Sequence, residues 1–482
     1  MRSKQKIACV SMVVAVAVAS GGLAGEIIIE PLVLELDVVD GVGLVSSINN
    51  IAVNDNGQWF VEADTDHPDT DADSVLLRDG AIYLREGDPV GAPDGATLDS
   101  FDSVTLNNPG DAGFNHFLDG TGGTDNDSGV YWNTVLVYQE SEEAPGLTPG
   151  TPFIGFFDVK INGSNQLLLT ASVDDPLIDS TVDRALYVLD IDEGGAPVAF
   201  TLIAVEGDVL AGQTESVTDF GTGPHESAIN DRGDVLFAAD LTGDSSMNAV
   251  IYLNDVLLAQ EGLESPVGGR NWSSLSSVEL DLNASGDHVY SGSLDGDSSS
   301  NLLLVRNGEK FRQEGDSLDA IGGVSVFTSF GSGPLEISDS GTVLWYGDWD
   351  DANTDIDTGL FLDDELLVQE GVTEIDFLLV DTLRGVEDGY HMSDNGRYII
   401  FEAILEDGRE GAFLITLPEA DCEGDANGDG VVNPLDSGYV LARFGCPVGT
   451  GDPDCDAADQ NGDGEVNPLD SGFVLARFGD CP

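Results

Sequence analysis

Two acidic segments near the end of the chain combine residue types and spacing that suit metal chemistry. The segment DANGDGVVNPLD spans residues 425–436, and DQNGDGEVNPLD repeats the pattern at 459–470. Each places oxygen-bearing side chains at positions 1, 3, 5, 9 and 12, a backbone carbonyl at position 7, and glycine at position 6, where the loop must turn sharply. Oxygen atoms in this order are typical of sites for a hard divalent cation.

This order is that of the EF-hand loop, so the sequence predicts two bound Ca²⁺ ions as cofactors. Clustered carboxylates repel one another when no cation is bound, so we expect chelation of calcium to unfold the segment unless disulfide bonds hold it. The predicted ligands, two of which act through their backbone carbonyls (Val431 and Glu465), are Asp425, Asn427, Asp429, Val431, Asn433, Asp436, Asp459, Asn461, Asp463, Glu465, Asn467 and Asp470.

Each loop leads into a predicted helix. The segments SGYVLARFG (437–445) and SGFVLARFG (471–479) are nearly identical, and the prolines before them suit a first helical turn. Neither loop has a convincing entering helix. A duplicated loop with only an exiting helix resembles the type I dockerin over residues 421–482, and this resemblance implies docking onto the cohesin domain of a scaffold protein.

The dockerin resemblance also implies which residues contact the partner. Well-studied dockerins often carry a hydroxyl pair at loop positions 10 and 11, whereas both copies here carry Pro-Leu, so the specificity class stays open. Because the two helices match, either one could face the partner. The alternative is a calcium-locked folding cap. The implied partner-binding residues are Pro434, Leu435, Tyr439, Arg443, Pro468, Leu469, Phe473 and Arg477.

The cysteines indicate disulfide bonds in this same segment. Apart from Cys9, they are Cys422, Cys446, Cys455 and Cys481. No Cys-x-x-Cys spacing or histidine partner accompanies them, so two disulfides are favoured over a metal site in an exported protein. The duplication favours the pairs 422–446 and 455–481, and a clasp between Cys422 and Cys481 is the alternative.

The beginning of the chain indicates export. Residues 1–25 contain Arg2, Lys4 and Lys6, then an apolar run over 7–19 and small residues around Ala24. This is the pattern of a cleaved secretory signal. No later segment approaches the roughly 20 apolar residues that a membrane-spanning helix needs. The sequence therefore predicts a secreted protein, extracellular or associated with the cell surface.

Between these two ends the chain repeats a polar turn, a glycine and an apolar strand. Six copies carry glycine at 57, 110, 233, 286, 341 and 396, and a seventh has Asn165, which also tolerates the left-handed conformation of such a turn. Tight-turn dipeptides such as Asp79-Gly80 indicate hairpins. A glutamate follows each hairpin, and its recurrence predicts a structural role, such as bonding to the neighbouring blade's backbone. These residues are Glu86, Glu140, Glu206, Glu261, Glu314 and Glu370.

Four strands in about 55 residues, repeated seven times, predict a mainly β fold. We expect a seven-bladed β-propeller over residues 26–418, followed by a small α-helical, dockerin-like domain over 419–482. The segment GLVSSI (43–48) is predicted to close the ring by pairing into the last blade. The turn pattern resembles the NxxGxxAF tandem repeats of secreted bacterial proteins, a family that implies no particular chemistry.

The sequence contains no recognised catalytic motif, and it leaves two function classes open. His225 and His391 lie near blade starts and are interpreted as structural, and tryptophans such as Trp345 as core residues. We favour a propeller with a binding or structural role. Its dockerin would attach it to a cohesin-bearing scaffold or cell-surface complex that takes part in polysaccharide utilisation. The alternative is a polysaccharide-degrading enzyme, either a glycoside hydrolase or a lyase.

The charge of the chain excludes nucleic acid as a partner. There are 17 basic and 89 acidic residues, for a formal net charge of −72, and phosphate binding needs basic clusters. Repulsion between so many like charges opposes compaction unless salt screens it. The composition therefore indicates a protein adapted to salty, calcium-containing surroundings.

This repulsion predicts a salt-dependent stability. The Debye length falls from about 30 Å at 0.01 M to about 3 Å at 1 M ionic strength, so screening favours the folded chain. We expect the melting temperature, followed by scanning calorimetry, to rise between dilute buffer and molar NaCl. A melting temperature that stays constant would contradict the adaptation to salt.

Overall fold

The computed structural model describes residues 14–16, 27–178, 183–223, 225–318, 325–418, 424–427, 431–448, 455 and 457–480. They form two compact units. The first spans Ile27–Leu417 and takes in β1 (Val14–Val16), and the second begins at Pro418. Within the described residues, no helix is both long enough and apolar enough to cross a membrane.

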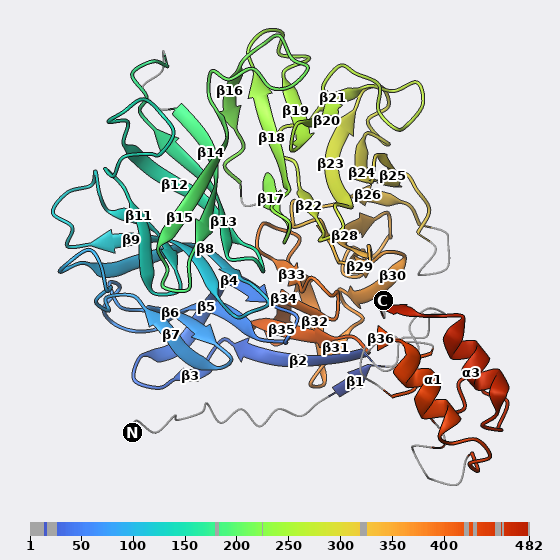
Figure 1. Ribbon diagram of the computed structural model, residues 1–482. Helices are drawn as coiled ribbons and strands as arrows, with labels where there is room; N and C mark the ends of the chain where they lie inside the picture. The colour runs from blue at the N-terminus through green and yellow to red at the C-terminus, as the bar shows by residue number, and fades with distance from the viewer. Residues whose placement is uncertain are drawn as a thin grey trace. The chain divides into compact units, whose positions relative to one another are not determined.

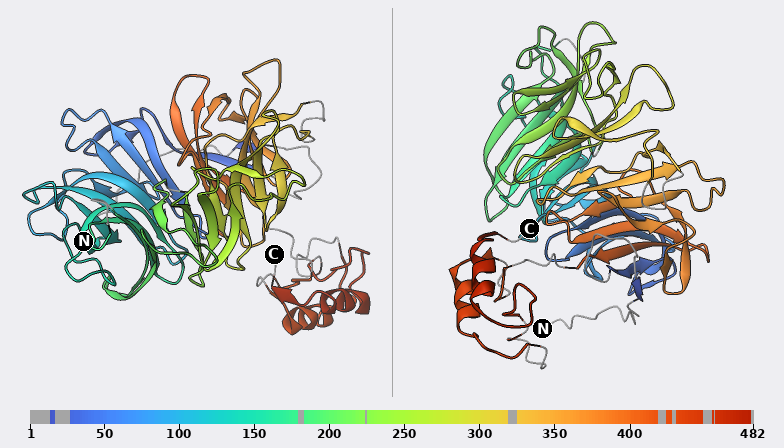
Figure 2. Two further views of the ribbon diagram at one scale, coloured as in Figure 1. Left: turned by 90° about the horizontal axis from the view of Figure 1, so that it is seen from above. Right: turned by 90° about the vertical axis from the view of Figure 1, so that its right-hand side faces the viewer.

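The first unit is the predicted seven-bladed β-propeller, in which antiparallel sheets follow one another around a ring (Figures 1 and 2). Blade 1 contains β3 (Val38–Val39), β4 (Gly43–Val53), β5 (Trp59–Thr65), β6 (Ser74–Arg78) and β7 (Ala81–Arg85). Blade 2 contains β8 (Thr97–Leu106), β9 (Ala112–Asp119), β10 (Ser128–Trp132) and β11 (Val135–Gln139). Blade 3 contains β12 (Phe153–Ile161), β13 (Gln166–Val173), β14 (Asp183–Ile191) and β15 (Pro197–Val205).

Blades 4 to 7 differ from blades 1 to 3 because their innermost strand is interrupted, so that two strands pair with one neighbour. Blade 4 contains β16 (Val217–Phe220), β17 (Ser227–Ile229), β18 (Val235–Leu241), β19 (Ala249–Leu253) and β20 (Val256–Gln260). Blade 5 contains β21 (Trp272–Ser274), β22 (Leu280–Leu282), β23 (His288–Leu294), β24 (Leu302–Arg306) and β25 (Glu309–Gln313). Blade 6 contains β26 (Phe327–Ser329), β27 (Glu336–Ile337), β28 (Val343–Trp349), β29 (Thr358–Leu362) and β30 (Glu365–Gln369).

Blade 7 closes the ring with a strand from the other end of the propeller. It contains β31 (Glu374–Ile375), β32 (Leu378–Leu383), β33 (Tyr390–Met392), β34 (Tyr398–Leu405) and β35 (Glu410–Thr416), completed by β2 (Ile27–Leu34). In the β2–β35 pair, Ile28 lies opposite Thr416. Strand β1 pairs with the outer edge of β2.

The segment predicted to close the ring was therefore wrong. Residues 43–48 belong to β4, which pairs with β5 inside blade 1, where Val45 lies opposite Thr65. The reason is that each strand before a polar turn forms a hairpin with the strand after that turn. The glutamate exit consequently carries the chain into the next blade, and the strand missing from blade 7 is the outermost one.

The turns adopt the backbone conformation that their residues favour. Asn165, which replaces the repeat glycine, has a φ of +58°, close to the +67° of Gly57 in the equivalent turn. Asp79 and Gly80, with φ of +48° and +75°, form the tight turn between β6 and β7. These local conformations explain why the repeat could be read from the sequence.

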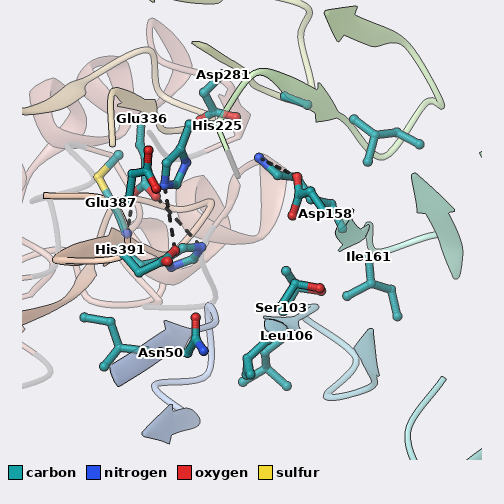
Figure 3. A pocket seen from close by; sticks show the side chains of 18 of the residues that line it. Asn50, Ser103, Leu106, Asp158, Ile161, His225, Asp281, Glu336, Glu387 and His391 are labelled. Carbon is teal, nitrogen blue, oxygen red and sulfur yellow. Dashed lines mark hydrogen bonds and ion pairs between the residues drawn. The ribbon is translucent and has the colours of Figure 1, made fainter. Parts of the chain in front are cut away.

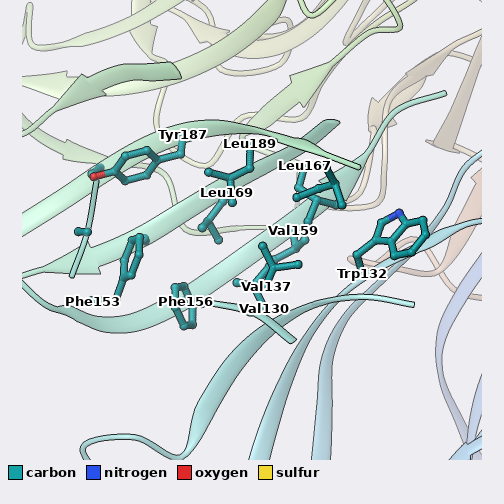
Figure 4. Packing of buried hydrophobic residues seen from close by; sticks show 14 of the residues in the cluster. Val130, Trp132, Val137, Phe153, Phe156, Val159, Leu167, Leu169, Tyr187 and Leu189 are labelled. Atoms are coloured by element: carbon teal, nitrogen blue, oxygen red, sulfur yellow. The ribbon is translucent and has the colours of Figure 1, made fainter. Parts of the chain in front are cut away.

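Apolar side chains fill the space between consecutive blades. In Figure 4, Val130 and Trp132 of blade 2 pack with Phe153, Phe156 and Leu167 of blade 3. Burial of each such side chain contributes roughly 1.5–3 kcal/mol. All five tryptophans of the chain are buried in these interfaces or beside them, as predicted for core residues, with at most 9% of their surface exposed.

A ring of side-chain hydrogen bonds, which we call the asparagine ring, ties the blades together. In five of the seven turns the first residue is asparagine, and its amide Nδ2 donates to the backbone carbonyl of the equivalent residue in the next blade. The donor–acceptor distances are 2.9 Å for Asn54–Asn107, 3.0 Å for Asn107–Asn162, 2.8 Å for Asn162–Asn230, 2.9 Å for Asn230–Asn283 and 2.9 Å for Asn283–Ser338.

Two further bonds continue the asparagine ring where serine replaces asparagine. The Asp339 N–H donates to the carbonyl of Asp394 at 2.6 Å, and the Asn395 N–H donates to Asp55 Oδ1 at 2.7 Å. Each asparagine of the ring is at most 5% exposed. Its Oδ1 also organises the turn, and in Asn283 it accepts from two backbone N–H groups at 3.0 Å.

The repeated glutamates bond mainly within their own blade, and Glu261 also makes the expected bond to the neighbouring blade, because its Oε1 accepts from the Leu275 N–H at 3.3 Å. Glu86 Oε2 accepts from the N–H groups of Asp73 and Ser74 at 3.0 Å, and Glu140 Oε2 accepts from the Ser128 N–H at 3.1 Å. These N–H groups lie where the third strand of the blade begins. The glutamate therefore fixes the start of that strand. This is a structural role, and a structural role can recur in every repeat.

The second unit consists of two matching halves. Helices α1 (Pro434–Leu441) and α3 (Pro468–Leu475) begin with asparagine caps, and β36 (Val431–Val432) pairs with β37 (Gly479–Asp480). The hydroxyls of Ser437 and Ser471 lie 2.8 Å apart between the helices. The core comprises Ala426, Val432, Val440, Ala458, Val466 and Val474.

The asparagine ring predicts a measurable contribution to stability. Ser338 already occupies the equivalent position and keeps the turn, because its Oγ accepts from the Thr342 N–H at 3.1 Å. Asn283→Ser should therefore lose only the bond between blades, about 0.5–1.5 kcal/mol, and Asn283→Ala should lose the turn bonds as well, about 2–3 kcal/mol in all. Urea unfolding followed by tryptophan fluorescence measures this. Equal stability of wild type and Asn283→Ala would show that the ring contributes nothing.

Candidate functional site

A cavity of about 660 Å³ occupies the centre of the propeller, and the innermost strands of all seven blades line it (Figure 3). Its size falls in the range of roughly 300–1,000 Å³ that is usual for small-ligand sites. Carboxyl groups dominate its polar lining. Lys160 of β12 is the only lysine or arginine among the described residues that line it.

Extra residues in the innermost strands of blades 4 to 7 bring most of these groups into the cavity. In blades 1 to 3 the polar turn begins nine positions after the buried start of the strand, as from Val45 to Asn54. In blade 4 it begins thirteen positions after, from Val217 to Asn230, and in blade 7 also thirteen, from Val380 to Ser393. The inserted segments carry the cavity residues His225, Glu226, Ser277, Glu279, Glu387 and Asp388.

Burial keeps several of the carboxyl groups protonated at unusually high pH. It raises the pKa of Asp158 to about 7 and that of Glu279 to about 8. It also raises the pKa of Asp388 to about 6 and that of Glu336 well above its ordinary value. In each case loss of contact with water is the largest cause, and neighbouring carboxylates add to it.

The two histidines of the cavity are neutral for the same reason. Burial lowers the pKa of His391 to about 4 and that of His225 well below its ordinary value, and the Lys160 charge adds to both shifts. His225 Nε2 lies 3.9 Å from Asp388 Oδ1, which joins blades 4 and 7 across the cavity, and His391 Nε2 lies 4.0 Å from Glu336 Oε1. Because the imidazoles are uncharged, these contacts are not ion pairs.

Several polar atoms of the cavity make no hydrogen bond. They are Asp158 Oδ2, Glu279 Oε2, His225 Nε2 and His391 Nδ1. The Asp158 side chain is only 6% exposed, and its nearest charged group is Lys160 Nζ, 3.7 Å from Oδ2. Buried polar atoms without partners are rare in native proteins, and they mark this cavity as a place where a ligand could supply the missing bonds.

The sequence interpretation missed this site. It assigned His225 and His391 to structural roles, whereas both line the cavity (Figure 3). The signal that could have revealed them is the length of the innermost strand together with its charged insertions, such as RGVEDG at 384–389. The spacing from one turn to the next does not reveal this difference, because blades 5 to 7 keep the same spacing as blades 2 and 3.

In the second unit, the last aspartate of each loop accepts hydrogen bonds from the backbone N–H groups of two other predicted calcium ligands. Asp470 is fully buried, and its two carboxylate oxygens accept from the N–H groups of Asn461 and Asn467 at 3.0 and 2.8 Å. Asp436 is equally buried and accepts in the same way from Asn427 and Asn433. The predicted aspartate ligand at loop position 5 of the first copy, residue 429, lies outside the described residues.

The remaining ligands of the second loop face the same turn. Asp459 accepts from the N–H groups of Asp463 and Gly464 at 3.2 and 2.9 Å, and Gly464 has the left-handed φ of +88° that position 6 needs. Across the part of the chain that the structure describes, no three carboxylate, histidine or cysteine groups stand close enough to chelate a metal. The donor set, made of carboxylate, amide and carbonyl oxygens, fits a calcium ion.

The predicted partner-binding residues fall into exposed and stacked groups. Leu435 and Leu469 are 68% and 66% exposed, which is unusual for leucine. The guanidinium of Arg443 stacks on Tyr439 with its carbon 3.4 Å from the ring centre, and Arg477 stacks on Phe473 at 3.5 Å. Further exposed apolar residues, matched between the two halves, are Leu441, Phe444, Leu475 and Phe478.

The favoured disulfide pairing was wrong. Cys446 bonds to Cys455, nine residues further along the chain, so the pairs 422–446 and 455–481 do not form. The bond closes the connection between the two halves, whereas the prediction had placed one bond inside each half. The clasp between Cys422 and Cys481 stays a prediction, because both lie outside the described residues.

Comparisons with protein families give two matches. A family model described as a family of unknown function (DUF7453) matches residues 30–255 and 191–371, which together cover more than half of the chain. The model of the dockerin type I domain matches residues 423–478, in agreement with the resemblance noted in the sequence. No curated protein matches the chain.

The chain matches solved structures only weakly. A gluconolactonase from Xanthomonas campestris is 8% identical with a TM-score of 0.31, over 86% of this chain and 97% of its own. Puromycin hydrolase is 12% identical with a TM-score of 0.39, over 81% and 59%. An aldose sugar dehydrogenase from Escherichia coli is 9% identical with a TM-score of 0.29, over 81% and 100%. Similarities this weak say nothing about function.

The cavity predicts that the stability of the propeller falls as the pH rises. Glu279 keeps its proton in the folded state up to pH about 8, but in the unfolded chain it loses it near 4.5. Between these values the unfolded state binds fewer protons, so the free energy of unfolding decreases with rising pH. Glu279→Gln should remove part of this slope and, at pH 8, stabilise the protein by on the order of 2–4 kcal/mol.

Tryptophan fluorescence during urea unfolding at pH 5 and pH 8 tests this prediction, since all tryptophans lie in the propeller. Glu309→Gln, on an exposed position of β25, is the matched control and should leave the slope unchanged. If wild type and Glu279→Gln show the same pH dependence, Glu279 does not carry the buried proton.

Proposed function

The chain belongs to the family of unknown function (DUF7453) and ends in a type I dockerin domain, and we propose that it is a secreted propeller held by calcium-dependent docking on a cohesin-bearing scaffold or cell-surface complex. The observation that carries this proposal is the duplicated loop and helix of the second unit. Each copy combines a buried aspartate at position 12 with an exposed leucine at position 11.

Calcium would be held by the twelve predicted ligands. The ion would take the place of the loop N–H groups as the partner of the loop carboxylates. It would also neutralise the repulsion between these carboxylates. Asp436 and Asp470 also cap the helices that follow, because each is the third helical residue and accepts from the backbone of the asparagine cap. Calcium binding and helix formation would therefore depend on the same two carboxylates.

Docking would use the exposed apolar residues of the two helices. Leu435 and Leu469 lie in the first turn of the helices, and Leu441 and Leu475 end them, all at least half exposed. Exposed apolar residues gathered in a small domain are typical of a protein-binding surface. The stacked Arg443 and Arg477 would border this surface and meet acidic groups of a cohesin.

The propeller would be the cargo, and we propose that it binds saccharide in polysaccharide utilisation. Its central cavity has ligand-sized volume and unsatisfied polar atoms. The second candidate is a glycoside hydrolase or lyase. The observation in favour of an enzyme is the set of protonated carboxyl groups in the cavity. A general acid needs a raised pKa of this kind.

Removal of calcium should abolish docking. We expect the full chain to bind a member of a cohesin panel in 2 mM CaCl₂ and to lose at least a hundredfold in affinity in EGTA, measured by calorimetry. The double variant Asp436→Asn, Asp470→Asn should behave in calcium as the wild type behaves in EGTA, because the bidentate ligand of each site is weakened. Asp364→Asn, an exposed propeller substitution, is the control.

The exposed leucines separate docking from calcium binding. Leu435→Arg together with Leu469→Arg should keep both calcium sites and lose cohesin binding. If no cohesin binds and calcium binding is intact, the unit is a folding cap. If calcium does not bind, the proposed attachment fails altogether.

A further inference from the structure

We propose that the central cavity of the propeller binds an amine-bearing saccharide, and that it recognises the ammonium group of an amino sugar with the carboxyl groups of blades 4, 5 and 7. This inference rests on the proposed role of the propeller in saccharide binding. It adds the chemical class of the saccharide, which neither the fold nor the family match assigns.

The charge of the cavity decides between classes of saccharide. Lys160 lies on β12 in blade 3, next to Asp158, and its charge also opposes the rise in the pKa of Glu279 and of Asp388, so it offsets part of the acidic charge of the cavity. Blades 4, 5 and 7 contribute Glu226, Glu279, Glu387 and Asp388, with no lysine or arginine among the described lining residues of those blades. An acidic polysaccharide would be repelled both here and by the net charge of −72, whereas an ammonium group would be attracted.

These four carboxyl groups lie close enough to act on one another. Burial is the largest cause of the raised pKa of Glu226, Glu279 and Asp388, and the Glu387 carboxylate raises all three further. A cation among these groups favours their ionised form, because it offsets both the loss of water and the repulsion between the carboxylates. They therefore favour a ligand that places one positive charge in their midst.

The spacing of the cavity groups argues against a metal ion as that cation. No three carboxylate or imidazole groups among the described residues are close enough to share a metal. A single metal ion would leave the cavity atoms that make no hydrogen bond on other blades without partners. An amino sugar extends over several ångströms and carries hydroxyl groups beside its ammonium group, so it can reach several blades at once.

The cavity atoms that make no hydrogen bond suit the hydroxyl groups of such a ligand. Asp158 Oδ2, in a side chain only 6% exposed, is a buried acceptor with no hydrogen bond. His225 Nε2 and His391 Nδ1 also lack partners, and a neutral imidazole nitrogen can donate to or accept from a sugar hydroxyl. Both histidines and Asp158 line the same cavity (Figure 3).

The experiment compares two sugars with the same linkage, one with free amino groups and one whose nitrogens are uncharged acetamides. The full-length protein in calcium is titrated by calorimetry with the β-1,4-linked disaccharide of glucosamine and with its fully N-acetylated counterpart. We expect the free amine to bind at least tenfold more tightly, and its advantage to shrink in molar NaCl. Binding should also release protons, seen as a heat that depends on the buffer, because protonated carboxyl groups must ionise to pair with the ammonium.

Variants locate the site. Glu279→Gln with Glu387→Gln should lower the affinity for the amine at least tenfold and leave that for the acetylated sugar unchanged, whereas Glu279→Asp should retain most of it. Glu309→Gln on β25 is the control, and the melting temperature shows that each variant is folded. Equal binding of both sugars would overturn the amine recognition but leave the saccharide role standing.

Two further outcomes are informative. If spermidine or CaCl₂ binds as tightly as the amino sugar and depends on the same carboxyl groups, the cavity is a general cation site and the inference is wrong. If neither sugar binds, the inference is also wrong, and cohesin binding measured on the same sample shows whether the proposed attachment survives.

Discussion

The propeller depends on one repeated interaction, the hydrogen bond from a turn asparagine to the carbonyl of the next blade. Each blade buries apolar faces against two neighbours, but apolar packing is not directional and does not by itself fix the angle between sheets. The asparagine ring supplies that direction near the axis, with five amide bonds of 2.8–3.0 Å. Because the same side chains hold the turns through Oδ1, blade structure and blade order depend on the same residues.

This constraint leaves the innermost strands free to vary. The turns and the second strands are fixed by the ring and by the interblade cores, so residues inserted before the turn change the cavity without changing the fold. Blades 4 to 7 use this freedom, and their insertions carry His225, Glu279 and Asp388. Burying so many carboxyl groups opposes folding as they ionise, and a large closed ring can tolerate that loss because its apolar interfaces are extensive.

The sequence predicted what local conformation determines. The seven blades, the left-handed Asn165 and the buried tryptophans follow from turn chemistry and strand periodicity, which act over a few residues. The closing strand was misplaced because several strands of similar pattern compete for one partner, and only packing decides among them. The cavity was missed because His225 and His391 lie far apart in sequence and line the same cavity only once the ring has closed. The pairing of Cys446 with Cys455 could not be predicted from the spacing of the cysteines.

The second unit joins two physical requirements in one residue. A helix leaves N–H groups unsatisfied at its start, and a calcium loop needs a carboxylate at position 12. In both copies the aspartate at that position is fully buried and accepts from the asparagine cap, so the loop is shaped from the helix side. A bound cation would then have to order only the half of the loop that lies away from the helix. Because both halves share one apolar core, ordering one loop stabilises the other, so we expect the two calcium ions proposed for this unit to bind cooperatively.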